Sequence, residues 1–115
     1  GTARAACGRP VALTVRAWTL EGTPVGLQWG QGAFVPQLSL EARLGAGQLP
    51  YGIERGVEGM LYGSRRLLVL PVEYQQPFPG PAPESLAFAR TGQALLVELF
   101  LPRARPLPPL PAQGA

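Results

Sequence analysis

The strongest local folding signals in this chain lie in residues 52–71, which read GIERGVEGMLYGSRRLLVLP. Ile53, Val57 and Met60 recur at helical spacing, and this pattern predicts one short helix of about two turns over residues 52–60. Gly56 and Gly59 lower the intrinsic helix propensity of that segment. We therefore expect the helix to depend on tertiary packing for its stability.

The second half of the same stretch predicts a turn followed by a strand. Gly63 is well placed to end the helical segment in a turn, because glycine adopts the backbone angles that other residues avoid. Residues 65–71 then form a nearly continuous apolar run that ends at Pro71. Such a run is typical of a strand buried on both faces, so we expect a central position in a sheet.

Outside this stretch, two segments alternate apolar and polar side chains in the manner of half-buried strands. Residues 11–18 read VALTVRAW and residues 37–44 read QLSLEARL. A turn at Gly22 predicts a hairpin from the first of these into residues 24–29. Residues 93–101, QALLVELFL, predict the last strand.

The remaining segments are rich in residues that interrupt regular structure. The chain of 115 residues contains 15 glycines and 14 prolines, and residues 72–92 are interpreted as a long surface loop. The element order is three strands, a short helix, a strand, a long loop and a final strand. This order predicts an α+β half-roll, a mainly antiparallel sheet wrapped over one short helix.

The residue types that are missing exclude several kinds of chemistry. The chain has no His, Lys, Asp or Asn, so it can build neither a Ser–His–Asp triad nor a phosphate-binding P-loop. One cysteine, Cys7, and no histidine leave no plausible zinc site and no intramolecular disulfide. We expect no metal and no cofactor. Prolyl isomerisation needs none of these groups, because it breaks no covalent bond.

Charge and hydropathy also limit the partners. The net charge is +3, but the ten arginines are spread along the chain and are not clustered with aromatic residues. This distribution predicts a solvated basic surface and no nucleic-acid partner. No apolar run approaches the length that crosses a bilayer, so the chain is not expected to be transmembrane.

Taken with this element order, the central stretch resembles the FKBP-type peptidyl-prolyl isomerases. The matching features are GVEGM at residues 56–60, Gly63, the pair Arg65–Arg66, the apolar strand and Pro71, followed by a similar closing strand. The resemblance implies an FKBP-like domain over residues 8–102. It leaves residues 1–7 as an irregular lead-in and residues 103–115 as a proline-rich tail.

The resemblance also implies where a substrate pocket would lie. Val15, Val25, Leu40 and Leu95 stand where the family has aromatic side chains, and Gly26 stands where it has a carboxylate. Leu49 and Pro50 stand at the dipeptide whose backbone N–H binds ligand, Ile53 stands at the tryptophan of the pocket floor, and Tyr74 or Phe78 would supply the loop tyrosine.

Two of these positions argue against efficient catalysis. Pro50 has no N–H, so the backbone donor to a substrate carbonyl is lost. Ile53 in place of an indole leaves a shallower pocket floor, although a proline ring can still be buried against aliphatic side chains. The pocket is therefore expected to be degenerate.

Three functions remain open at this point. The chain could be a protein-binding, scaffold or chaperone-like module with weak or absent isomerase (rotamase) activity, whose partner is a protein or a proline-containing peptide. It could instead be an active isomerase that assists the folding of proline-containing clients. In the third interpretation the domain only presents its tail, since residues 105–111 fit the R-x-x-P-x-x-P pattern that SH3-type domains bind as a polyproline II helix.

Overall fold

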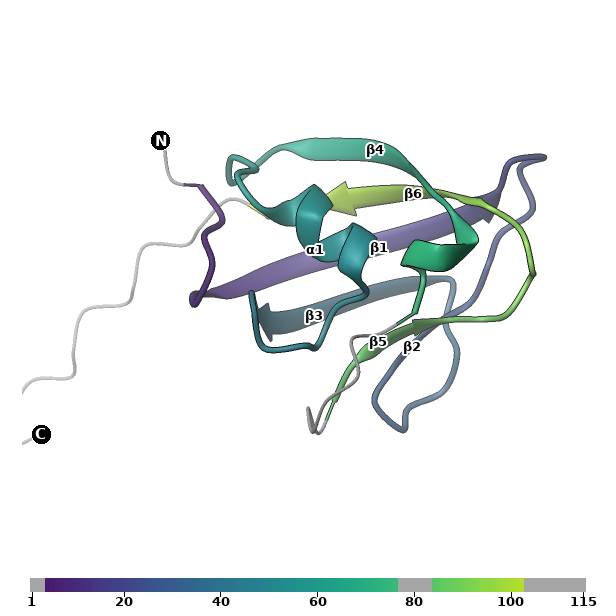
Figure 1. The fold of residues 1–115 in the computed structure, drawn as a ribbon, viewed down its shortest axis with the longest axis horizontal. Coiled ribbons are helices and arrows are strands. Elements are labelled where there is room, and N and C mark those ends of the chain that lie inside the picture. Colours follow the sequence, from purple (N-terminus) through teal and green to yellow (C-terminus); the bar gives the residue numbers. More distant parts are fainter. Residues whose placement is uncertain (1–3, 77–83, 103–115) are drawn as a thin grey trace, which may run out of the picture.

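Four antiparallel strands form the main sheet in the order β3-β1-β6-β4 (Figure 1). In this computed structural model, residues 4–76 and 84–102 are described. The strands span Pro10–Thr19 (β1), Gln37–Arg43 (β3), Arg65–Leu70 (β4) and Leu95–Phe100 (β6). The described residues contain one α-helix, α1, over Tyr51–Val57, and it lies against one face of the sheet.

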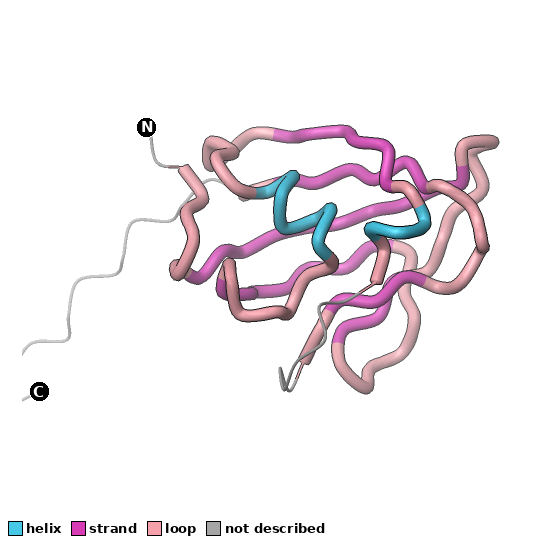
Figure 2. The backbone as a smooth tube through the Cα atoms, viewed as in Figure 1, coloured by secondary structure: helices cyan, strands magenta, loops and turns pink. Residues whose placement is uncertain are grey.

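Three smaller elements complete the described fold (Figure 2). β2 (Leu27–Trp29) and β5 (Leu86–Phe88) pair antiparallel as a separate two-stranded sheet. A 3₁₀ helix, η1, follows β4 directly and spans Val72–Tyr74. The coarse prediction, an α+β fold with a mostly antiparallel sheet and one short α-helix, is confirmed for the described residues.

The hydrophobic core lies between the main sheet and α1. The apolar positions of β1 predicted from alternation all face this core, and Leu13 and Val15 are 1% and 0% exposed. β6 contributes its own alternate residues to the same layer, and α1 closes it with Ile53 and Val57. The predicted strands over residues 11–18, 37–44 and 93–101 are confirmed with small changes at their ends.

The prediction of a central position for residues 65–71 is wrong. β4 pairs with β6 alone and lies at one edge of the described sheet. The two faces of β4 differ in burial. Leu70, on one face, is 1% exposed, whereas Leu67 and Val69, on the other face, are 62% and 58% exposed. The continuous apolar run therefore does not reflect burial on both faces, because one apolar face of β4 is exposed to solvent.

Two other predictions need correction. The turn around Gly22 exists, but the strand that follows it is short and pairs with β5, so the expected hairpin is reduced to the bridge between Trp18 and Pro24. Residues 72–92 are also more than a surface loop, since they contain η1 and β5, and Leu86 is fully buried. The helix ends at Val57, although Met60 is buried as expected.

The described part of the lead-in is packed onto the domain. The Ala5 N–H donates to the Met60 carbonyl at 2.9 Å, and the Gly59 N–H donates back to the Ala5 carbonyl at 2.9 Å. Ala5 is 3% exposed and belongs to the core. Arg4 and Leu61 form an isolated β-bridge beside these hydrogen bonds, and the pairing ends before β4 begins at Arg65.

Candidate functional site

The aliphatic residues and the proline that were predicted to line the pocket are buried. Val15, Ile53 and Leu95 are 0% exposed. Leu49, Val25, Leu40 and Pro50 are buried as well, and Gly26 lies next to Val25 with its carbonyl bonded to the Ala89 N–H. The side chains that the resemblance assigns to a substrate pocket thus fill the interior themselves.

Pro50 has a structural role at the start of α1. It adopts φ −54° immediately before the helix, and its carbonyl accepts the N–H groups of Ile53 at 3.0 Å and Glu54 at 2.9 Å. Proline suits a helix start, because its missing N–H would have no partner within the helix there. Glu54 connects α1 to the turn that follows β3, because its carboxylate accepts the Gly45 N–H at 2.8 Å.

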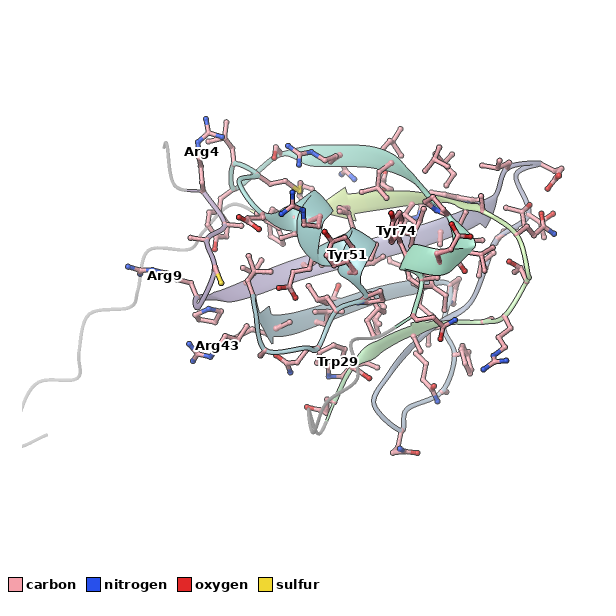
Figure 3. The ribbon with its side chains drawn as sticks, viewed as in Figure 1. Arg4, Arg9, Trp29, Arg43, Tyr51 and Tyr74 are labelled. Atoms are coloured by element: carbon pink, nitrogen blue, oxygen red, sulfur yellow. The ribbon has the colours of Figure 1, made fainter. Side chains whose placement is uncertain are left out.

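Tyr74 is the exposed member of the predicted set, and it lies beside a residue that the sequence reasoning did not assign. Its ring centroid is 5.6 Å from that of Tyr51, at an interplanar angle of 38° (Figure 3). Tyr51 begins α1 and Tyr74 ends η1. The two side chains, which we call the tyrosine pair, are 44% and 47% exposed and present aromatic surface to solvent.

The tyrosine pair exists because Gly52 carries no side chain. A Cβ at this position would overlap Leu70 Cδ1 and come within 3.0 Å of Tyr74 Cβ. The absence of that carbon lets η1 approach the first turn of α1 closely enough for the rings to meet. The close approach at Gly52 was not predicted from the sequence.

A hollow of about 380 Å³ lies beside η1. Its lining comes from η1, β5 and the segment before β6, and consists of Val72, Gln75, Gln76, Ala87, Phe88, Arg90, Thr91 and Gly92. The Gln75 amide links the end of β4 to the segment before β6 by donating to the carbonyls of Leu70 at 3.0 Å and Gln93 at 2.9 Å. The wall of the hollow is mixed polar and apolar, with one guanidinium from Arg90.

The tyrosine pair presents aromatic surface that another molecule could contact. Aromatic faces such as those of the tyrosine pair bind proline rings and aliphatic side chains by contact and burial. No group of three His, Cys, Asp or Glu side chains that could hold a metal occurs within residues 4–76 and 84–102. Nor does any helix in that part of the chain have the length and apolar character needed to cross a membrane.

Neither the role of Tyr51 nor the hollow was predicted from the sequence. Tyr51 precedes the helical pattern by one residue, and its contact with Tyr74 joins positions far apart in the chain. The hollow depends on β5, which lies in a segment that was interpreted as loop. Two candidates, Phe78 and the SH3-type motif at residues 105–111, lie outside the described residues.

We compared the chain with protein families and with curated proteins. No family matches the chain, and no curated protein matches it.

Proposed function

We propose that this chain is an FKBP-like half-roll that acts as a protein-binding, scaffold or chaperone-like module with weak or absent isomerase activity. The observation that carries the proposal is the burial of the residues assigned to the pocket. Val15, Ile53 and Leu95 are fully buried in the core, whereas Tyr74 is half exposed. A substrate proline would have to displace core side chains before it reached the position of the family's pocket.

The energetic cost of that displacement supports weak or absent catalysis. Exposing one buried Val, Leu or Ile side chain costs about 1.5–3 kcal/mol. Moving Val15, Ile53 and Leu95 together would consume most of the binding free energy of a micromolar peptide, which is about 8 kcal/mol. Little would remain to stabilise a twisted amide, because catalysis requires tighter binding of the transition state than of the ground state.

Among the described residues, the tyrosine pair is the surface that we assign to a proline-containing segment. Both rings are exposed and are tilted relative to each other. The close contact between α1 and η1 at Gly52 holds them in place. Proline-rich segments bind aromatic surfaces of this kind at low entropic cost, since their backbone is already extended. Client recognition by the tyrosine pair thus needs no interior pocket.

One observation favours the alternative, an active isomerase. Tyr74 is exposed at the position that the resemblance assigns to the family's loop tyrosine. An isomerase assay separates the two functions, because only the alternative requires faster interconversion of a Xaa-Pro bond than in buffer.

Binding is tested with a fluorescein-labelled proline-rich peptide and fluorescence anisotropy. We expect Tyr74→Ala and Tyr51→Ala each to weaken binding about tenfold, which corresponds to about 1.4 kcal/mol. Phe34→Ala is the matched control, since Phe34 is 52% exposed in the loop between β2 and β3. Equal affinity for the wild type and both tyrosine variants would reject the tyrosine pair as the binding surface.

A further inference from the structure

β4 leaves one edge of the main sheet open among the described residues. The sheet order β3-β1-β6-β4 gives β4 a single neighbour, β6. The lead-in bridge, Arg4 to Leu61, ends before β4 starts and does not cover it. An open edge carries backbone N–H and C=O groups that can pair with another strand.

The hydrogen-bond register identifies which backbone groups face this edge. The Leu101 N–H donates to the Ser64 carbonyl at 3.0 Å. In an antiparallel pair, the backbone N–H and C=O groups of successive residues point alternately toward the neighbouring strand and away from it. Counting from Ser64, every second residue of β4 therefore forms its hydrogen bonds with β6. The others direct their N–H and C=O groups away from β6, and these are Arg65, Leu67 and Val69.

The same residues carry exposed side chains on the face of the sheet opposite α1. Leu67 and Val69 are more than half exposed, which is unusual for two apolar residues on one strand. In the strand register Val69 lies across from Leu96, and Leu96 lies across from Trp18. The edge is therefore bordered by an apolar row that extends inward over β6 and β1.

A wide, open depression of about 490 Å³ lies beside this apolar row. Its lining residues come from β1, β6, β4 and the turn after β1, and they are Arg16, Trp18, Thr19, Leu20, Gly22, Leu67, Leu96 and Glu98. Leu20 in the turn is 59% exposed and enlarges the apolar surface.

The opposite edge of the sheet has a different character. The exposed positions of β3 are polar or charged, and include Ser39, Glu41 and Arg43. Charged side chains on an edge strand discourage pairing with other chains. β4 carries no such protection at Leu67 and Val69, so the two edges differ in their capacity to accept a strand.

Charge at the start of β4 indicates the chemistry of the occupant. One carboxylate, Glu98, lies 3.5 Å from the Arg65 guanidinium and 3.7 Å from that of Arg16. Two cations around one anion leave an excess of positive charge on this face. The Arg65 side chain is 61% exposed above the Phe100 ring, so it can reach an acidic group of a partner.

We propose that the open edge of β4 binds an extended segment of a partner protein as an added antiparallel strand. The segment carries alternating apolar side chains that contact Leu67 and Val69, and an acidic residue that lies near Arg65. Backbone hydrogen bonds to the outward groups of β4 supply affinity, and the apolar row and Arg65 supply specificity. This surface faces away from α1 and does not depend on the tyrosine pair.

The test uses a fluorescein-labelled peptide of alternating valine and threonine with glutamate at the end that meets Arg65. We expect saturable binding by fluorescence anisotropy. Leu67→Pro should weaken it about tenfold or more, because proline removes an outward N–H without removing a bond to β6. Glu41→Pro on β3 is the matched control, since its N–H faces the opposite edge, and it should bind as the wild type does.

Further variants separate docking from a loss of folding. Leu67→Lys keeps the backbone N–H but places a charge on the edge, and it should weaken binding while circular dichroism and the melting temperature stay unchanged. Arg65→Gln should weaken the glutamate peptide about threefold and leave a glutamine version of the peptide unaffected. A peptide N-methylated at its valines should not bind, because it cannot pair with a strand edge.

Several outcomes would overturn the proposal. These are failure of the peptide to bind at millimolar concentration, equal binding by Leu67→Pro and the wild type, and binding by the N-methylated peptide. Light scattering on the chain alone, which measures its oligomeric state, gives a further outcome of this kind. A dimer that Leu67→Pro dissociates would make a second copy the occupant of β4, in place of a different partner.

Discussion

Replacing Gly52 with alanine places a methyl group into the contact between α1 and η1. The new Cβ would overlap Leu70 Cδ1 and lie 3.0 Å from Tyr74 Cβ and 3.4 Å from the Tyr74 carbonyl oxygen. Leu70 is 1% exposed and has little room to rotate away. The strain must therefore be relieved by moving η1, which carries Tyr74.

Two opposing terms set the expected change in stability. Alanine favours a helix over glycine by about 1 kcal/mol. Overpacking a well-packed contact costs about 1–3 kcal/mol. We expect Gly52→Ala to lower the free energy of unfolding by up to about 2 kcal/mol, and each kcal/mol corresponds to about 4–8 °C in melting temperature for a domain of this size.

Thermal denaturation followed by circular dichroism measures this change. Gly56→Ala should cost less, because its Cβ would meet Leu68 Cδ2 at 2.5 Å and Leu99 Cδ1 at 3.1 Å, and the half-buried Leu68 can shift. Arg55→Ala, at an exposed helix position, is the control and should stay within about 0.5 kcal/mol of the wild type. A higher melting temperature for Gly52→Ala would refute the close approach of η1 to α1.

Three further substitutions test the packing and polar contacts. Ile53→Ala should lower the free energy of unfolding by about 2–5 kcal/mol in chemical denaturation, because Ile53 is fully buried, and a loss below about 1 kcal/mol would contradict its place in the core. Glu98→Gln should lower the free energy of unfolding by less than about 1 kcal/mol at low salt and leave it unchanged at high salt, because both of its arginine partners are largely exposed. A larger decrease that persists at high salt would contradict this. Glu54→Ala should cost about 1–2 kcal/mol by removing the acceptor of the Gly45 N–H, and an unchanged denaturation midpoint would show that this bond contributes nothing.

Strands with strict alternation could be predicted from the sequence. β1 and β3 each bury one face against the core, so their side chains follow a period of two that has no competing interpretation. The register of burial, with Leu13 and Val15 inside, follows directly from that period. Helical spacing located α1 for a similar reason, since Ile53 and Val57 both face the sheet.

The position of β4 could not be predicted, because strand order depends on pairing between distant segments. An apolar run is compatible with burial on both faces and equally with an exposed apolar face. Leu67 and Val69 distinguish these cases only once β6 is seen to be the single neighbour of β4. The pairing of β2 with β5 was missed for the same reason, since each strand is short and its partner lies far along the chain.

One member of the tyrosine pair was named from the sequence. Tyr74 could be named, with Phe78, only from the resemblance, and it is half exposed. Its partner Tyr51 could not, because the meeting of the rings depends on the close approach at Gly52. Whether apolar residues such as Val15 and Leu95 line an open pocket or fill a core depends on packing in three dimensions.

The central claim, a filled pocket with weak or absent catalysis, is tested most directly by the rate of Xaa-Pro interconversion. The measurement is a protease-coupled assay on a proline peptide, repeated by NMR exchange spectroscopy to exclude cleavage of this chain by the protease. Our account predicts a rate close to that in buffer alone for the wild type and for Tyr74→Ala. A large acceleration by the wild type would contradict it, and loss of that acceleration in Tyr74→Ala but not in Phe34→Ala would assign the activity to Tyr74.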